Sequence, residues 1–255
     1  SDLYGELDAE LATLPLDLPQ GMAAGELRIE TSSTALSGLS DAFFELWGYP
    51  YECSEQLASR ILAVIALGDV LAAFGASVPS DEQIRAAFAE AFAKLGERQQ
   101  DNGGLGFWTK DDNPFVTVHA AHALVRAEQR GYSVPAGLRD GVMKYLGELA
   151  KHIEAYELRY DFTMSATMRA ALLAYGLYVR ALRGEAVADE AAALLAAHDP
   201  KLLSMETEAW LLAVLAQSPA YAAEAARLVT QFESELDESA AGASWVNAYE
   251  KGSLV

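Results

Sequence analysis

Residues 48–74 read GYPYECSEQLASRILAVIALGDVLAAF and join the only cysteine of the chain to an uninterrupted apolar segment. Ser54 is a residue type favoured at helix starts, and the apolar positions from Leu57 to Phe74 fall on nearly all sides of the predicted helix. A helix that is apolar all round is typically buried. The stretch therefore predicts a core helix whose amino end carries Cys53.

Cys53 and Gln56 lie three positions apart at this predicted helix start. Side chains three apart in a helical turn approach to about 5–6 Å between Cβ atoms, which lets the sulfur reach the Gln side-chain carbonyl. A helix amino end lowers the pKa of a thiol and supplies N–H groups for an oxyanion. Attack of the thiolate on the amide, with loss of ammonia, would give an internal thioester. Spacing alone leaves a second interpretation open, in which Cys53 is a small buried hydrophobe.

The segment around this pair, YPYECSEQLASR at residues 49–60, resembles the Cys-x-Glu-Gln thioester motif of bacterial alpha-2-macroglobulins, relatives of the complement thioester proteins. A second block at residues 98–108 reads RQQDNGGLGFW and is similar to the family's Arg-Gln-x-x-Asp-Gly-Gly-Phe-x-x-Trp segment. Together with RGYSVP at residues 130–135, the resemblance covers residues 27–250. The chain departs from the family at Glu52, where the family usually has Gly.

The resemblance implies a role for each residue at the site. Cys53 would be the leaving thiol and Gln56 the acyl donor, and the site would contain neither a metal nor a catalytic residue of an enzyme. Further residues would support the loop. Glu55 would do so through hydrogen bonds to backbone N–H groups, and Tyr49 and Tyr51 by shielding the acyl bond. Trp108 would form a lid or wall.

Beyond the first 33 residues the chain is predicted to be all-α. Residues 1–33 are expected to be a connector with a short extended segment from a neighbouring β domain, and residues 34–255 the thioester domain. Buried and amphipathic helix patterns alternate along it, which indicates concentric inner and outer layers in an α/α toroid, although a superhelical solenoid gives a similar signal. One inner helix is missing at the end, so we expect an incomplete ring. The inner type is predicted at 57–74, 114–129, 163–182 and 206–216, and the outer type at 80–100, 136–153, 186–197 and 219–232.

Composition limits the classes of partner. The chain has 255 residues, of which 52% are hydrophobic, enough for one large domain with its own core. It carries 37 acidic against 18 basic residues, a net charge of −19. Nucleic acids and anionic membrane surfaces bind clustered Lys and Arg, so this balance argues against both. The sequence indicates no signal peptide, lipobox or membrane-spanning run, and we expect no membrane insertion.

Other polar residues have ordinary interpretations. His119 and His122 have a spacing that can bind metal, but no third ligand presents itself, so buried polar residues are the preferred interpretation. Asp111, Asp112 and His152 are predicted to be solvated. No cofactor is expected.

The resemblance implies the function of a broad-spectrum protease inhibitor. In the family a protease cuts a bait region, the molecule rearranges, and the thioester acylates a Lys of the protease, here through Gln56. This chemistry is used once, so the protein would not be an enzyme. The implied location is the periplasm, with a lipid anchor outside this chain, and the implied partners are target proteases, neighbouring β domains and a peptidoglycan synthesis enzyme. Two alternatives stay open: an α/α-toroid enzyme of the cyclase or glycosidase type, and a helical binding scaffold in which Cys53 is inert.

Overall fold

The computed structural model of the chain describes residues 36–73, 78–108, 111–198, 203–239 and 242–245. The predicted connector at residues 1–33 lies outside these residues. Contacts divide the chain into two units, Ser1–Ser37 and Gly38–Val255, and the elements below belong to the second unit apart from the first two residues of α1. The division at residue 33 that the sequence suggests stays a prediction.

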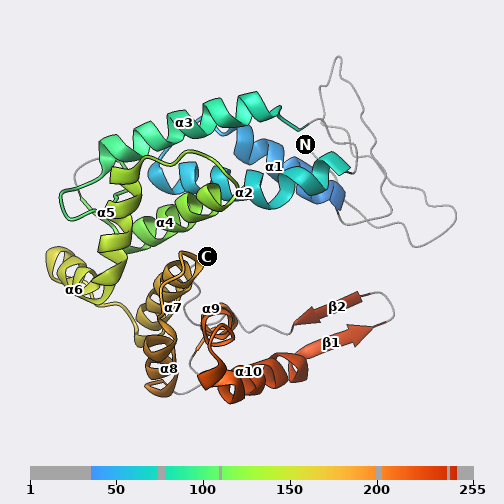
Figure 1. The fold of residues 1–255 in the computed structure, drawn as a ribbon, viewed down its shortest axis with the longest axis vertical. Coiled ribbons are helices and arrows are strands. Elements are labelled where there is room, and N and C mark those ends of the chain that lie inside the picture. Colours follow the sequence, from blue (N-terminus) through green and yellow to red (C-terminus); the bar gives the residue numbers. More distant parts are fainter. Residues whose placement is uncertain (1–35, 74–77, 109–110, 199–202, 240–241, 246–255) are drawn as a thin grey trace, which may run out of the picture. The chain divides into compact units, whose positions relative to one another are not determined.

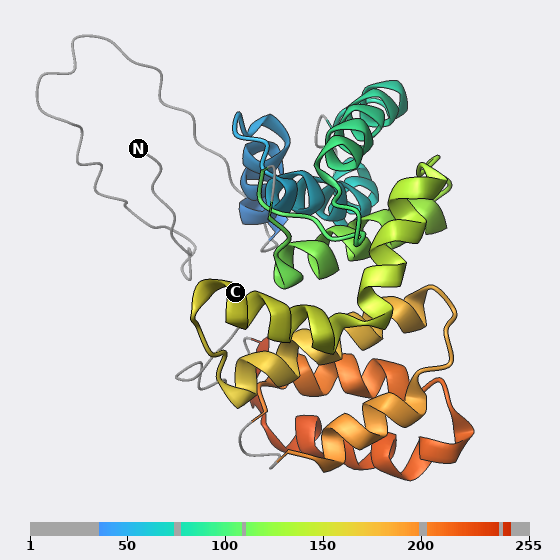
Figure 2. The same ribbon diagram turned by 90° about the vertical axis from the view of Figure 1, so that its left-hand side faces the viewer.

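Four described helices form an inner layer in which each contacts the next one along the chain (Figures 1 and 2). The second of them has the most continuous buried surface, because small and branched apolar residues occupy most of its positions. These helices are α2 (Ser54–Ala73), α4 (Pro114–Gln129), α7 (Ala166–Leu182) and α9 (Met205–Leu215).

Amphipathic helices lie against this inner layer. A capping box starts α3, since the Ser80 side chain accepts from the Gln83 N–H and the Gln83 side chain accepts from the Ser80 N–H. Contacts join α2 to α3, α4 to α5, and α9 to both α8 and α10, so inner and outer helices alternate as predicted. The remaining helices are α1 (Leu36–Gly48), α3 (Asp81–Arg98), α5 (Ala136–Gly147), α6 (Leu149–Tyr160), α8 (Ala188–Ala196), the 3₁₀ turn η2 (Pro219–Tyr221) and α10 (Ala222–Ser234).

Two predicted elements differ from the structure. The helix expected over residues 136–153 is broken at Glu148, which leaves the helical region with φ −121° directly after Gly147, a poor helix former. The segment after α10, for which the all-α prediction includes no strand, forms an antiparallel hairpin of β1 (Leu236–Ser239) and β2 (Gly242–Trp245), in which Leu236 pairs with Trp245. The Trp245 indole N–H donates to the Phe232 carbonyl at 3.0 Å, which ties the hairpin to α10.

Helix α2 is less buried than its composition predicts. Leu57, Ile61 and Ile65 are buried, whereas Val70 on another side is 39% exposed. Among the described helices only α2 is long and apolar enough to cross a membrane by length and composition, a test that the core helix of a soluble protein also passes. Its buried side chains belong to the larger of two hydrophobic clusters, so in this structure α2 acts as a core helix.

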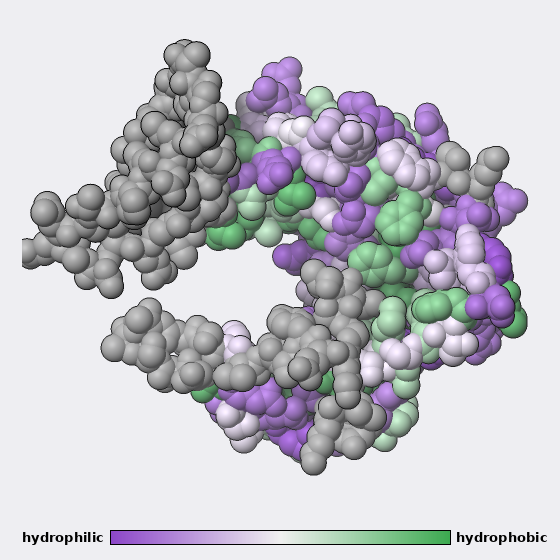
Figure 3. Space-filling model, turned by 180° about the vertical axis from the view of Figure 1, so that it is seen from behind, coloured by the Kyte–Doolittle hydropathy of each residue, from purple (hydrophilic) through white to green (hydrophobic). Residues whose placement is uncertain are grey.

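Apolar side chains are also present on the surface. Figure 3 shows one face on which hydrophobic residues are interspersed among hydrophilic ones. In the described part of the chain the exposed large apolar residues include several around the start of α2: Tyr49, Tyr51, Phe107 and Trp108.

Candidate functional site

The turn that carries Cys53 is built by helix capping. Helix α2 begins at Ser54, and the Cys53 carbonyl accepts the Leu57 N–H at 3.0 Å, so Cys53 rather than Ser54 is the N-cap. The Gln56 side chain folds back and its Oε1 accepts the Cys53 backbone N–H at 3.2 Å. This is half of a capping box, with a thiol where Ser or Thr usually stands. Capping thus brings the Gln56 carbonyl to the residue that carries the thiol.

Glu55 faces the same thiol from within the first turn of α2. Its Oε2 lies 4.0 Å from the Cys53 Sγ, and its Oε1 accepts a hydrogen bond of 2.7 Å from the Ser59 hydroxyl. Both of these partners are side chains, and support of the loop by Glu55 through backbone N–H groups stays a prediction. The Cys53 N–H is already taken by Gln56, and the side chain of Glu55 reaches along the helix to Ser59 instead. Cys53 itself is only 7% exposed.

A line of polar contacts continues from Ser59 into the core. The Ser59 Oγ lies 2.9 Å from His119 Nε2 on α4, and His119 Nδ1 lies 3.1 Å from the Tyr175 hydroxyl on α7. The same hydroxyl lies 2.9 Å from His122 Nδ1. Burial lowers the pKa of His119, and lowers that of His122 to about 4 with the help of the nearby His119 and Arg126 charges. Both imidazoles are therefore neutral at pH 7. The two histidines are half-buried and hydrogen-bonded, so they are polar residues at the edge of the core rather than fully inside it.

Metal binding has no support at this position. Within the part of the chain that the structure describes, no group of three or more His, Cys, Asp or Glu side chains could hold a metal ion. His119 and His122 share the Tyr175 hydroxyl as a hydrogen-bond partner.

Glu52, the departure from the family motif, is held by basic residues. Its carboxylate pairs with Lys94 and with Arg60, the latter at 3.2 Å. The hydrogen bond from Lys94 lowers the pKa of Glu52 and outweighs partial burial, with Arg60 adding to the effect. Arg98 donates to the Glu52 carbonyl at 2.8 Å and to the Ser54 Oγ at 3.4 Å. These bonds fix the segment before Cys53 against α3.

The second block of the resemblance lies against the start of α2. The Ser54 N–H donates to the Phe107 carbonyl at 2.8 Å, which joins the two segments directly. Gly103 has φ +87°, and a Cβ there would lie 2.1 Å from the Gly141 carbonyl oxygen, so only Gly fits this close approach to α5. Gln99 donates to the Leu138 carbonyl at 3.0 Å. The loop is thus fixed on α5 on one side and on the Cys53 turn on the other.

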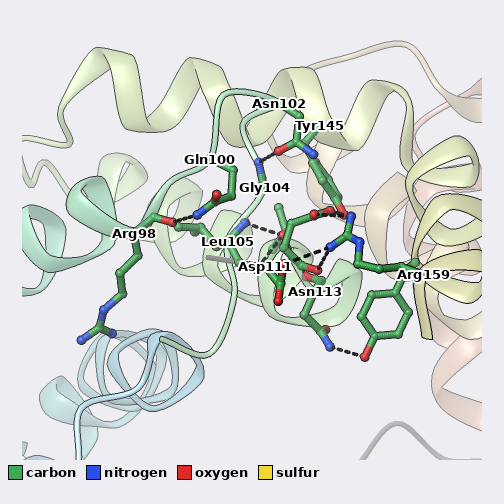
Figure 4. A network of polar contacts seen from close by, with 12 residues as sticks. Arg98, Gln100, Asn102, Gly104, Leu105, Asp111, Asn113, Tyr145 and Arg159 are labelled. Atoms are coloured by element: carbon green, nitrogen blue, oxygen red, sulfur yellow. Dashed lines mark hydrogen bonds and ion pairs between the residues drawn. The ribbon is translucent and has the colours of Figure 1, made fainter. Parts of the chain in front are cut away.

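Figure 4 shows the polar network beside this loop. Asp112 is 5% exposed, accepts a 2.7 Å bond from the Tyr145 hydroxyl and pairs with Arg159 at 2.9 Å. Burial would raise the pKa of Asp112, but the bonds from Tyr145 and Arg159 lower it overall. His152 stacks on Tyr145 with ring centroids 3.8 Å apart. The expectation that Asp112 is solvated is therefore wrong, because partners distant in sequence cover it, whereas His152 is half-buried by its stacking on Tyr145.

The aromatic residues expected to shield the acyl bond lie at the surface. Tyr49 and Tyr51 form an edge-to-face pair with centroids 5.7 Å apart, and they are 36% and 65% exposed. Trp108 is 54% exposed with the Arg98 guanidinium 5.2 Å from its ring centroid. Their shielding role stays a prediction. Of the predicted site residues, Cys53, Glu55 and Gln56 are joined by contacts. The structure adds Ser59, His119 and Tyr175 to this network, and the sequence did not predict that these three residues lie there.

Comparisons with known proteins identify relatives of the chain. No protein-family model matches it. It is 25% identical over 230 residues to circularly permutated Ras protein 2 of Dictyostelium discoideum, a match that covers 84% of this chain. It is 39% identical over 94 residues to alpha-2-macroglobulin of Escherichia coli K12, a match that covers 36% of this chain. The chain spans 6% of the length of each of these two relatives.

A solved structure agrees with the second relative. The E. coli alpha-2-macroglobulin structure that runs from domain MG7 to the C-terminus matches 76% of this chain and 30% of its own length, with a TM-score of 0.60 and 24% identity. The α/α toroid predicted from the alternating helices is the fold of that matched region. Whether the ring is incomplete stays a prediction. Bacterial alpha-2-macroglobulins are therefore both sequence and structural homologues of this chain, which corresponds to one region of those much longer proteins.

Proposed function

We propose that residues 34–255 are the thioester domain of an alpha-2-macroglobulin-like protease inhibitor, in which Cys53 and Gln56 form an internal thioester. The observation that carries the proposal is the 3.2 Å contact from the Cys53 N–H to Gln56 Oε1, which draws the acyl-donor carbonyl group to the residue with the thiol. Homology to bacterial alpha-2-macroglobulins supports the inhibitor family.

The local geometry suits acyl transfer. When the Cys53 sulfur attacks the Gln56 side-chain carbonyl carbon, negative charge develops on Oε1. The Cys53 backbone N–H already donates to that oxygen at the positive end of α2, which stabilises a developing oxyanion. Collapse of the tetrahedral species expels ammonia and leaves the thioester. Cys53 is 7% exposed, and this burial slows hydrolysis of the bond by water.

The activity of the whole protein follows the resemblance. The thioester acylates a Lys amine of an attacking protease through Gln56, and the reaction releases the Cys53 thiol. Each molecule reacts once, so the protein is an inhibitor and not an enzyme. Target proteases, neighbouring β domains and a peptidoglycan synthesis enzyme are the proposed partners, and the periplasm is the proposed location, with a lipid anchor outside this chain.

Titration of the free thiol tests the proposal. Fresh protein is unfolded rapidly in denaturant with a thiol reagent, which removes the protection that burial alone gives Cys53. The proposal predicts little free thiol in the untreated protein and one thiol per chain after incubation with methylamine. The Gln56→Ala variant is the matched control, because its thiol has no acyl donor and should titrate fully with or without methylamine. A full thiol titre in the untreated wild type would support the inert scaffold instead.

A further inference from the structure

Five side chains on three helices form a continuous line of contacts that ends at the thiol. The line begins at His122 on α4, passes to the Tyr175 hydroxyl on α7 at 2.9 Å, and returns to His119 on α4 at 3.1 Å. On α2 it continues from His119 to Ser59 at 2.9 Å and to Glu55 at 2.7 Å. The other oxygen of Glu55 lies 4.0 Å from the Cys53 Sγ, the outer limit of a hydrogen bond to sulfur.

The donors in this line have one consistent direction. Ser59 gives its only hydroxyl proton to Glu55, so the Ser59 oxygen must accept from His119 Nε2–H. A neutral His119 protonated at Nε2 has an acceptor at Nδ1, which takes the Tyr175 hydroxyl proton. The Tyr175 oxygen can then only accept from His122 Nδ1–H. Every proton in the line points toward Glu55.

Packing holds the line in place from behind. Tyr175 is 5% exposed and stacks on Trp210 with centroids 4.5 Å apart, and His119 stacks on Phe115 at 5.7 Å. The core therefore fixes His119, which fixes the Ser59 hydroxyl. One Glu55 oxygen is anchored by Ser59, and the other is left facing the Cys53 sulfur.

We propose that Glu55 transfers the proton in acyl transfer at Cys53, and that Ser59 and His119 are positioning residues that aim it. The proposal rests on the thioester function proposed above. During formation, the thiol proton moves to Glu55, sulfur attacks the Gln56 carbonyl carbon, and the C–N bond breaks as Glu55 returns the proton to the departing ammonia. During aminolysis, an incoming primary amine forms the new C–N bond, the C–S bond breaks, and Glu55 carries the amine proton to the Cys53 sulfur.

A structural explanation competes with this one. Glu55 and Ser59 are four positions apart on α2, and such pairs also stabilise helices slightly. Stabilisation alone would affect folding, not the rate of acyl transfer. Rates measured on folded variants therefore separate the two explanations.

The experiment measures the rate of thiol release by methylamine in the 255-residue chain and in four variants, three at the site and one control, that are first shown by circular dichroism to be helical. Glu55→Gln keeps an acceptor for Ser59 but cannot transfer a proton, and we expect its thioester to form and react about a hundredfold more slowly. Ser59→Ala should slow the reaction about tenfold, while Ser59→Thr keeps the hydroxyl and should stay within about threefold of the wild type. Ser133→Ala, at an exposed position, is the matched control and should have no effect.

The outcomes distinguish this proposal from the function on which it rests. A wild type without any thioester overturns both. A wild type with a thioester, together with Glu55→Gln and Ser59→Ala variants that react at the wild-type rate, overturns the proton-transfer role and leaves the thioester function standing. Equal slowing in Ser59→Ala and Ser59→Thr would overturn the positioning role of the Ser59 hydroxyl. A folded Glu55→Gln variant that retains a free thiol and an unmodified Gln56 supports the proposal.

Discussion

The Oγ of Ser59 on α2 lies 2.9 Å from Nε2 of His119 on α4, although the two residues are 60 positions apart in the sequence. The other ring nitrogen of His119 lies 3.1 Å from the Tyr175 hydroxyl. Both nitrogens are therefore hydrogen-bonded, and attack on an acyl group would require one of these bonds to break. His119 belongs to the contact network that reaches Cys53, but its two hydrogen bonds oppose a nucleophilic role.

This arrangement predicts which nucleophiles the thioester accepts. Activation of hydroxyl groups requires a free imidazole nitrogen that forms an acyl-imidazole. With His119 engaged, primary amines should react faster than alcohols of comparable size. The measurement is a competition between methylamine and a large excess of glycerol, with the products on Gln56 identified by mass spectrometry. Amide should dominate, and predominant ester would contradict the prediction.

The buried Asp112 should contribute strongly to stability. In Asp112→Ala the buried Tyr145 hydroxyl and the Arg159 guanidinium both lose their partner, and we expect a loss of about 3 kcal/mol in the free energy of unfolding. Tyr145→Phe leaves the Arg159 pair intact and should cost about 1 kcal/mol. Urea unfolding measures both. Asp111→Ala is the control, because its side chain is 63% exposed, and it should change stability by less than about 0.5 kcal/mol. Equal effects of Asp112→Ala and Asp111→Ala would be inconsistent with the network.

Stability should fall in mild acid because of His122. Its pKa is lowered to about 4 in the folded state, mainly by burial, against the ordinary value of 6.5. The unfolded chain therefore binds the proton first as the pH falls, so the stability from the neutral imidazole is complete above pH 6.5 and is lost toward pH 4. In His122→Gln this part of the pH dependence should be absent. Urea unfolding between about pH 7 and about pH 5 measures the slope. An unchanged slope in the variant would assign the effect to other groups.

Fold and chemistry should be separable at Cys53. The residue caps α2 at its edge, while the inner helices supply the core, so Cys53→Ala should keep its helical content and lose about 1 kcal/mol of stability at most. The variant should no longer couple to a fluorescent primary amine. Circular dichroism and gel fluorescence measure the two properties. Global unfolding of Cys53→Ala would refute their independence.

Local signals were sufficient to predict much of the helical structure. The apolar patterns predicted helices over residues 114–129 and 206–216, where the structure has α4 and α9. Local signals act within one turn at such starts, since Pro114 is the first residue of α4 and Ser80 caps α3. The break at Glu148 and the hairpin at residues 236–245 were missed. The sequence signals there are weak, and contacts that are distant in sequence stabilise the final conformation, as the Trp245 bond to Phe232 does.

The candidate site was predictable only in its local part. Cys53, Glu55 and Gln56 share one turn, so spacing and resemblance were enough to group them. The burial of Asp112 and the line from Ser59 through His119 to Tyr175 depend on how α4, α6 and α7 lie against the loop and α2. No spacing along one helix encodes such contacts, and the His119–His122 spacing alone indicated polar residues without a third metal ligand but not the partners that they contact.

The intact mass of the freshly purified chain, measured with and without methylamine, tests the central claim most directly. A thioester between Cys53 and Gln56 predicts a mass lower than that of the sequence by one ammonia, and methylamine should add one methylamine to that product and place it on Gln56. Gln56→Ala should have the mass of its sequence under both conditions. A wild-type chain with the full sequence mass before treatment and no methylamine adduct afterwards would contradict the account.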